Sequence, residues 1–150
     1  MRVKNVMMRG DLKTSADMAD PEGSRKLTAI LAADVAGYSR LMQVDDRATV
    51  AMLEAYRSVF REHIVAHEGR IVDMAGDSVL AVFDSPTEAV RAAFDIQSVL
   101  AERNEALPEK RRMRFRIGVN LGDVISKADG TVYGDGVNIA ARLESIAEPG

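Results

Sequence analysis

Leu31-Ala-Ala-Asp-Val-Ala-Gly-Tyr-Ser39 is an apolar, strand-like run that carries one carboxylate, Asp34, near its end. A second aspartate, Asp77, adjoins another apolar run in Met74-Ala-Gly-Asp-Ser-Val-Leu-Ala-Val-Phe83. Burying a carboxylate beside such residues is costly unless a partner neutralises it, and a divalent cation shared by two carboxylates does so. Taken singly, each aspartate is better explained as the cap of a turn at a strand end. The pair instead predicts a Mg²⁺ or Mn²⁺ site.

Length and composition indicate one ordinary domain. The chain has 150 residues, of which 47% are hydrophobic, and this is enough for a hydrophobic core. Its net charge of −3 gives no reason to expect nucleic acid or an anionic membrane as a partner. The absence of cysteine excludes disulfides and thiolate metal sites and fits a cytoplasmic protein. Residues 27–35 are too short a run for a membrane span, and residues 1–13 are too charged for a secretory signal.

The first half of the chain predicts strand, helix and hairpin in turn, after a tail or linker at residues 1–24. We expect a buried strand at 26–35, followed by a turn at Gly37 and a helix start. A helix from Asp45 or Asp46 to about residue 67 is expected to end at Gly69. Its apolar face would contain Leu53, Tyr56, Phe60 and Ile64. Residues 70–74 and 78–83 predict a hairpin with Asp77 at its tip.

The second half begins with a capping box, Ser85-Pro-Thr-Glu88, which predicts a helix to about residue 106. The side chains expected to be buried by this helix are Val90, Ala93, Phe94 and Leu100. Apolar and basic residues then alternate in a strand, with Met113, Phe115, Ile117, Val119 and Leu121 on one face and Arg112, Arg114 and Arg116 on the wetter one. A short strand at 131–133 and a helix at 136–146 follow. The order predicts a ferredoxin-like βαββαβ α/β fold with an extra C-terminal strand and helix.

Three segments resemble the signature blocks of the class III nucleotidyl cyclase catalytic domain, the adenylate and guanylate cyclase family, in its bacterial soluble form. They are Ala32-Ala-Asp-Val-Ala-Gly-Tyr-Ser39, Ala75-Gly-Asp-Ser-Val-Leu-Ala-Val-Phe83 and Tyr133-Gly-Asp-Gly-Val-Asn-Ile-Ala-Ala-Arg-Leu143. The resemblance extends over residues 25–150, with the blocks in the family's order and spacing. It implies an enzyme that converts a nucleoside triphosphate, ATP in preference to GTP, to the 3′,5′-cyclic monophosphate and pyrophosphate.

The resemblance also implies a metal site and a dimer. Asp34, Asp77 and the backbone carbonyl of Val35 would hold two Mg²⁺ or Mn²⁺ ions that activate the ribose 3′-hydroxyl and neutralise the triphosphate. In this family the metal residues of one site and its Asn/Arg pair come from different subunits. We therefore expect a homodimer with its sites at the interface, and a regulatory domain in a longer chain.

Two further groups of residues are candidates for binding the substrate. Gly37, Tyr38 and Ser39 lie where a turn opens into a helix, so their backbone N–H groups could cradle phosphate oxygens. Asn138 and Arg142 have i, i+4 spacing and share one helix face. By resemblance, Asn138 orients the ribose and Arg142 stabilises charge on the α-phosphate. Without the resemblance, they would be an amide near a helix start and a solvent-facing arginine.

The chain departs from the family pattern in two places. Asp73 occupies the position where a lysine usually reads the purine, and Thr131 occupies that of its partner. The chain also ends before the terminal strands that normally carry a further phosphate-binding lysine, so we expect a C-terminally incomplete domain. These departures leave a second interpretation, a catalytically degenerate domain that dimerises, binds nucleotide and regulates.

Three other motifs are given ordinary interpretations. Ala75-Gly-Asp-Ser78 is a poor substitute for the Gly-Gly-Asp/Glu-Glu-Phe turn of a diguanylate cyclase. His63 and His67 have the i, i+4 spacing of a helical metal pair, but no third ligand is evident nearby, so we interpret them as the cationic end of a helix. The basic run Lys110-Arg-Arg112 is interpreted as a solvated strand entrance.

Overall fold

The computed structural model describes residues 24–150, so the predicted tail lies outside the described residues except for Ser24. Five antiparallel strands form one sheet in the order β2-β3-β1-β4-β5. The strands are β1 (Ser24–Val35), β2 (Gly69–Asp73), β3 (Val79–Phe83), β4 (Phe115–Ser126) and β5 (Val132–Tyr133). The order β2-β3-β1-β4 is the ferredoxin-like one. The predicted fold class is therefore confirmed.

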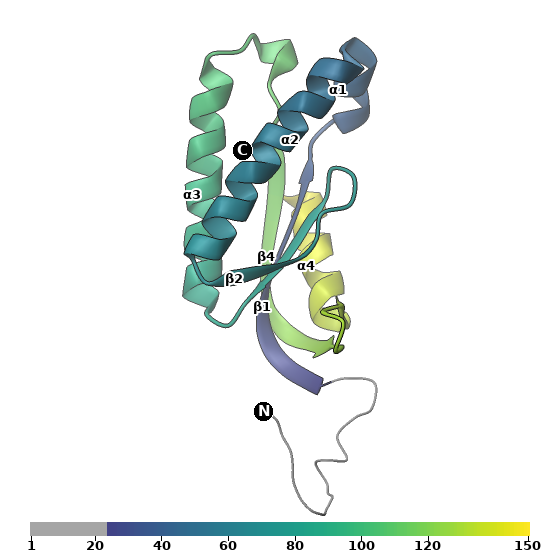
Figure 1. Ribbon diagram of the computed structural model, residues 1–150, viewed down its shortest axis with the longest axis vertical. Helices are drawn as coiled ribbons and strands as arrows, with labels where there is room; N and C mark the ends of the chain where they lie inside the picture. Colours follow the sequence, from purple (N-terminus) through teal and green to yellow (C-terminus); the bar gives the residue numbers. More distant parts are fainter. Residues whose placement is uncertain (1–23) are drawn as a thin grey trace, which may run out of the picture.

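Helices cover both faces of this curled sheet. They are α1 (Tyr38–Val44), α2 (Asp46–Ala66), α3 (Pro86–Glu105) and α4 (Asp135–Ile146), with a short 3-10 helix at Glu109–Arg111. α2 and α3 pack side by side on one face, and α4 packs on the other (Figure 1). Of the helices in the described range, none is long and apolar enough to cross a membrane.

Side-chain caps fix where the two long helices begin. The Asp45 carboxylate accepts a hydrogen bond from the Ala48 backbone N–H at 3.0 Å at the start of α2. The Ser85 hydroxyl accepts one from the Glu88 N–H at 3.2 Å, and Pro86 is the first residue of α3. Such caps satisfy N–H groups that have no partner within the helix. Both helix starts were predicted from the sequence.

The main core lies between α2, α3 and the sheet. The predicted apolar face of α2 is buried, and Phe60 from this face stacks at 4.8 Å between ring centroids on Phe115 of β4. A buried polar contact also joins the two helices, because the Tyr56 hydroxyl donates to the Asn104 side chain at 2.8 Å. Asn104 in turn pairs with the backbone of Met113, which leads into β4. Buried polar groups of this kind are tolerated because they are hydrogen-bonded.

Gly69 does not end α2, contrary to our prediction. The helix ends at Ala66, and Glu68 takes the left-handed conformation with a φ of 62°. Gly69 is instead the first residue of β2, where a Cβ would lie 2.4 Å from the ring of Phe83 on β3. The glycine is therefore required by the close approach of an aromatic ring.

The buried face of α3 is rotated relative to the predicted one. Leu100 is buried as expected, but Val90 is 42% exposed and Phe94 is 71% exposed. The inward positions are taken instead by Ala89, Ala92 and Ile96. Alanine at two of these positions lets the helix approach its neighbours closely, and the larger side chains then lie at its margin.

The strand predicted around residues 112–121 is shifted toward the C-terminus. It begins at Phe115 and runs to Ser126, and its partner β1 is equally long. Leu121, expected in the core, is 50% exposed, and Leu27 on β1 is 59% exposed. One end of the β1–β4 pair extends beyond α2 and α3 (Figure 1), which agrees with the exposure of these two side chains.

Candidate functional site

The two aspartates singled out by the sequence come together at the end of β1. β1 lies beside β3, so the turn between β2 and β3 reaches the position where Asp34 and Val35 end their strand. Asp77, in this turn, accepts a hydrogen bond from the Val35 backbone N–H through Oδ2 at 3.3 Å. Two carboxylates from segments far apart in sequence are thus anchored at one strand end.

A guanidinium is bound to the first of these carboxylates. Asp34 on β1 lies opposite Arg116 on β4 in the sheet register. Arg116 donates through Nε to Oδ1 at 3.0 Å and through Nη2 to Oδ2 at 2.7 Å. This two-point contact has the geometry of a strong charge-assisted pair. Both oxygens of Asp34 are thus hydrogen-bonded to Arg116, and an ion bound by this carboxylate would have to share or displace that contact.

α4 completes the surroundings of this pair. Arg116 also donates to the Ser145 carbonyl at 3.2 Å, and its Nη2 lies 3.5 Å from a carboxylate oxygen of Glu144. Burial, together with a hydrogen bond to Asp34 and repulsion from it, raises the pKa of Glu144 to about 7. The site therefore contains more carboxylate than the sequence predicted, and one of its carboxyl groups holds a proton readily.

A glycine on β4 allows α4 to come this close. A Cβ on Gly118 would lie 2.4 Å from the Glu144 backbone nitrogen and 2.7 Å from the Ala140 carbonyl oxygen. Real Cβ contacts do not reach such distances, so any larger residue would push α4 away from the sheet. Gly118 thus sets the position of Glu144 relative to Asp34.

The turn that carries Asp77 is held from α2. The Arg57 guanidinium donates to the carbonyl of Met74 and, at 2.7 Å, to the carbonyl of Gly76. These carbonyls precede Asp77, so Arg57 acts as a positioning residue for the turn. The sequence contains no motif around Arg57 that would have identified this role.

Within residues 24–150, the side chains of the predicted ribose and phosphate residues on α4 form no hydrogen bond or ion pair with Asp34 or Asp77. Asn138 and Arg142 are both exposed, on successive turns of one helix face. An apolar stripe runs beside them: Ile139 is 39% exposed, Leu143 38% and Ile146 79%. Apolar side chains gathered on one helix face are typical of a surface that another element covers.

The predicted phosphate-binding segment follows the metal residues directly. Gly37 caps the start of α1, Tyr38 is partly buried against the main core, and Ser39 is exposed. These residues lie two to four positions beyond Val35, so they are near the end of β1 by connectivity. The structure thus places the start of α1 directly after the end of β1, where Asp34 lies.

The predicted base-reading residues share one cavity. Asp73 at the end of β2 and Thr131 just before β5 both line a cavity of about 460 Å³. Arg70, also in its wall, donates to the Gly130 carbonyl at 3.2 Å and so ties the loop to β2. This volume lies within the range typical of small-ligand sites. The pairing of Asp73 with Thr131 was inferred from the family pattern alone, and the fold brings them together.

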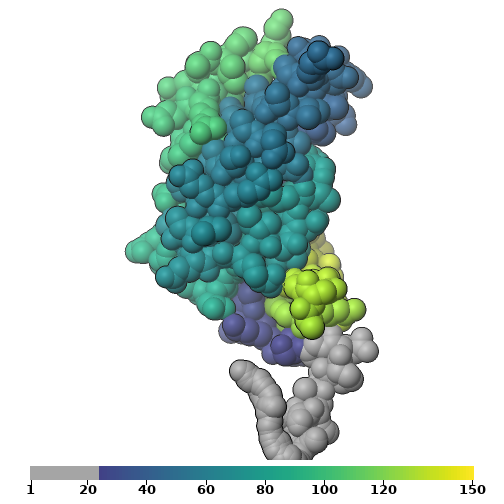
Figure 2. All heavy atoms as spheres, in the orientation of Figure 1, coloured from purple at the N-terminus to yellow at the C-terminus, as the bar shows by residue number. Residues whose placement is uncertain are grey.

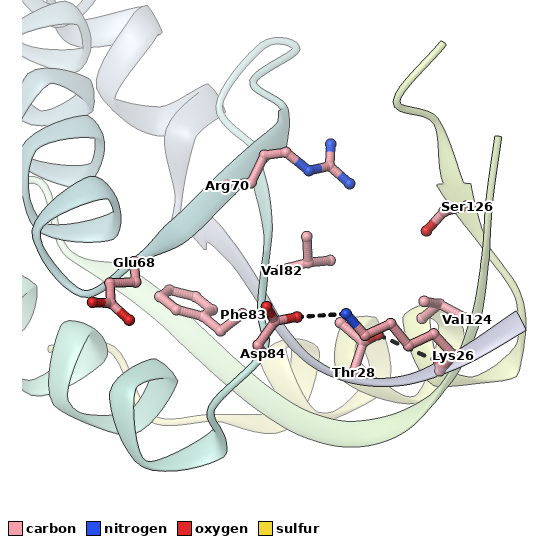
Figure 3. Close-up of a pocket in the computed structure, with 9 residues that line it drawn as sticks. All are labelled: Lys26, Thr28, Glu68, Arg70, Val82, Phe83, Asp84, Val124 and Ser126. Carbon is pink, nitrogen blue, oxygen red and sulfur yellow. Dashed lines mark hydrogen bonds and ion pairs between the residues drawn. The ribbon is translucent and has the colours of Figure 1, made fainter. Parts of the chain in front are cut away.

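A neighbouring cavity of about 290 Å³ shares Arg70 with the first, but none of the predicted site residues lines it (Figure 3). Its basic residue Lys26 is neutralised by Asp84 at 2.8 Å. Its remaining walls come from β1, β3 and β4, including Val82 and Val124. We therefore locate the candidate site at the end of β1 and in the Asp73 cavity.

Comparison with known proteins gives consistent matches. Residues 22–150 match the sequence model of the family "Adenylate and Guanylate cyclase catalytic domain". The chain is 45% identical over 134 residues to "Putative adenylate cyclase 3" of Rhizobium meliloti, covering 89% of this chain and 23% of that protein. It is 31% identical over 129 residues to "Adenylate cyclase" of Streptomyces coelicolor, covering 85% of this chain and 32% of that protein. The chain thus spans less than a third of either relative.

A solved structure is similar over most of its length. The crystal structure of "Adenylate/Guanylate Cyclase/Hydrolase" from Silicibacter pomeroyi matches with a TM-score of 0.78 at 44% identity. The match covers 85% of this chain and 74% of that one.

Proposed function

Because the chain belongs to the adenylate and guanylate cyclase catalytic domain family, we propose that it is a nucleotidyl cyclase working as a homodimer with two metal ions per site. It would convert ATP, in preference to GTP, to the 3′,5′-cyclic monophosphate. The observation that carries this proposal is the convergence of Asp34 and Asp77 on Val35 at the end of β1. The names of the relatives, two of them adenylate cyclases, support ATP as the substrate.

The donor groups at this strand end fit a hard divalent cation. Carboxylate and carbonyl oxygens are the ligands that Mg²⁺ and Mn²⁺ prefer. Asp34 already binds a cationic group, the Arg116 guanidinium. We propose that Asp34, Asp77 and the Val35 carbonyl hold the ions. When bound, the ions would lower the pKa of the ribose 3′-hydroxyl and neutralise charge on the triphosphate.

The chain's own residues would orient the nucleotide for the reaction. The 3′-hydroxyl would release its proton to solvent as its oxygen attacks the α-phosphorus. The bond from that phosphorus to the bridging oxygen would break, and pyrophosphate would leave in line with the attack. Asn138 would hold the ribose and Arg142 the developing charge on the α-phosphate. The N–H groups of Gly37, Tyr38 and Ser39 would donate to phosphate oxygens.

A homodimer is the assembly that this geometry supports. Asn138 and Arg142 are exposed on α4 and lie beside an apolar stripe, whereas the aspartates are at the end of β1. We propose that a second copy covers the stripe, so that each site takes its aspartates from one chain and its Asn/Arg pair from the other. The greater length of the curated relatives supports a further, regulatory domain in such proteins.

Asp73 favours a second candidate, a degenerate domain that binds nucleotide without turnover. The experiment that separates the two uses full-length protein with Mn²⁺ and either ATP or GTP. We expect cyclic nucleotide and pyrophosphate in equal amounts. Nucleotide binding measured by calorimetry with no product from either nucleotide would support the regulatory candidate instead.

Replacing Asp73 with lysine is expected to raise the selectivity for ATP. A lysine can donate to adenine N1, whereas an ionised aspartate can only accept, which suits the N–H donors of guanine. We expect the ratio of kcat/KM for ATP to that for GTP to rise about tenfold or more in Asp73→Lys. Asp73→Asn, which removes the charge but adds only a short donor, should change the ratio less. An unchanged ratio in Asp73→Lys would show that residue 73 does not read the base.

A further inference from the structure

The two histidines of the chain lie at the end of α2, His63 in its last turn and His67 as its C-cap. They are close to Asp95 of α3, which is distant from them in the sequence. Our interpretation of His63 and His67 assumed that no third ligand is near, and the structure corrects it. Asp95 supplies the missing donor, and one ligand atom from each of these residues lies within 4.8 Å of the others. The sequence could not reveal this, because the contact depends on the packing of α2 against α3 (Figures 1 and 2).

His67 is held between two carboxylates. Its Nε2 lies 2.8 Å from Asp95 Oδ2, and its Nδ1 lies 2.7 Å from Glu88 Oε1. These hydrogen bonds raise the pKa of His67, as expected for a ring that two negative groups surround. Arg91 balances only Glu88, at 3.1 Å. His67 is therefore surrounded by negative charge, and a metal ion that binds its ring would have to displace a proton.

We propose that His63, His67 and Asp95 form a binding site for a Zn²⁺-type transition-metal ion, separate from the catalytic aspartates. Imidazole and carboxylate donors suit Zn²⁺, Co²⁺ or Ni²⁺ better than Mg²⁺. Three protein ligands leave a fourth position for water. The ion would join α2 to α3.

The arrangement of Glu88 supports metal binding through His67 Nε2. Metal-binding histidines commonly donate their other ring N–H to a carboxylate, which fixes the ring orientation. Glu88 occupies that place on Nδ1, leaving Nε2 facing Asp95. The Asp95 side chain is 53% exposed and that of His67 17% exposed, so an ion could enter from solvent while one ligand stays ordered.

Only a small adjustment would be needed to seat the ion. Zn²⁺ bonds of about 2.1 Å place tetrahedral ligand atoms about 3.4 Å apart. The present donors are separated by distances from 2.8 Å, between His67 and Asp95, to no more than 4.8 Å. Shifts of the donor atoms by about an ångström would bring them to this spacing.

The histidines themselves are the reporter, because the chain contains two histidines and no cysteine. We would titrate the tag-free 150-residue protein with ZnCl₂ and follow the imidazole ring signals by ¹⁵N NMR, with stoichiometry from calorimetry. Both rings should shift together at one equivalent of Zn²⁺, and MgCl₂ should leave them unchanged. Binding at the catalytic aspartates cannot produce direct coordination shifts in both rings.

Variants then test each ligand. His63→Gln and Asp95→Asn should each weaken Zn²⁺ binding at this site more than tenfold, and Glu88→Gln about tenfold. Glu102→Gln, an exposed acid elsewhere on α3, is the matched control and should leave the affinity unchanged. Saturating Zn²⁺ should raise the Tm of the parent protein by about 5 °C, and Asp95→Asn should abolish this rise. Unshifted ring signals, or equal affinity in His63→Gln, would overturn the proposal.

Discussion

Replacing Asp34 or Asp77 with alanine is expected to lower Mn²⁺-dependent cyclase activity by at least about a thousandfold, which corresponds to losing about 4 kcal/mol of transition-state stabilisation. Both carboxylates meet at the end of β1, where Asp77 accepts from the Val35 N–H. Each is proposed to hold the metal ions, so the loss of either should leave the 3′-hydroxyl without activation. The measurement is the initial rate of cyclic nucleotide formation by full-length protein.

The fold should survive both substitutions. Alanine at position 77 removes one partly buried hydrogen bond, a loss of about 1 kcal/mol. Alanine at position 34 leaves Arg116 with Glu144 and the Ser145 carbonyl as partners. It also removes repulsion between neighbouring carboxylates when no metal is bound. Circular dichroism and Tm should therefore remain close to those of the parent protein.

An aspartate away from the site provides the control for this experiment. Asp84→Asn removes an exposed carboxylate that pairs with Lys26 and lines a cavity whose walls include none of Asp34, Val35 and Asp77. It should retain full activity, because exposed ion pairs contribute little to stability. Normal turnover in folded Asp34→Ala or Asp77→Ala would show that the metal assignment is wrong.

Local signals in the sequence were sufficient for most of the fold. The caps at Asp45 and Ser85 act through contacts three residues away, and the hairpin around Asp77 depends on a short turn between two apolar runs. Apolar runs indicated β1 and β3, and the alternation of apolar and basic residues indicated β4. Because each of these features is encoded within a few residues, no tertiary information was needed to predict it.

The buried face of α3 and the role of Gly69 depend on tertiary packing, which the sequence pattern does not contain. Val90 and Phe94 belong to the apolar half of α3, yet alanines at neighbouring positions determine which side turns inward. Gly69 resembles a helix terminator, and its actual requirement is the Phe83 ring on another strand. In both cases the deciding partner is distant in sequence, so periodicity and local turn chemistry gave the wrong answer.

The candidate site also contains residues that the sequence predicted and residues that only the structure identifies. Two carboxylates beside apolar runs identified Asp34 and Asp77, and the family pattern identified the pair Asp73 and Thr131, which line one cavity. Arg116 was assigned only to the wetter face of a strand, because its contact with Asp34 spans 82 residues and depends on strand register. Supporting residues of this kind carry no motif, and only the tertiary structure identifies them.

Mixing two inactive variants is expected to restore activity if the site is shared between chains. Asp34→Ala retains Arg142, and Arg142→Ala retains Asp34, so a heterodimer of the two contains one complete site and one doubly defective site. Random exchange makes half of the dimers heterodimers, so the mixture should recover about a quarter of parental activity. Each variant alone should remain near background.

A second mixture makes this test specific for sharing in trans. Asp34→Ala combined with Asp77→Ala should recover nothing, because both defects lie in the half-site that one chain contributes and every heterodimer site lacks one aspartate. Subunit exchange, followed by energy transfer between labelled chains, must be shown for both mixtures. If exchange is complete and the Asp34→Ala and Arg142→Ala mixture stays inactive, each chain carries its own site or none. The exposed Asn138 and Arg142 on α4 would then need a role other than catalysis across the interface.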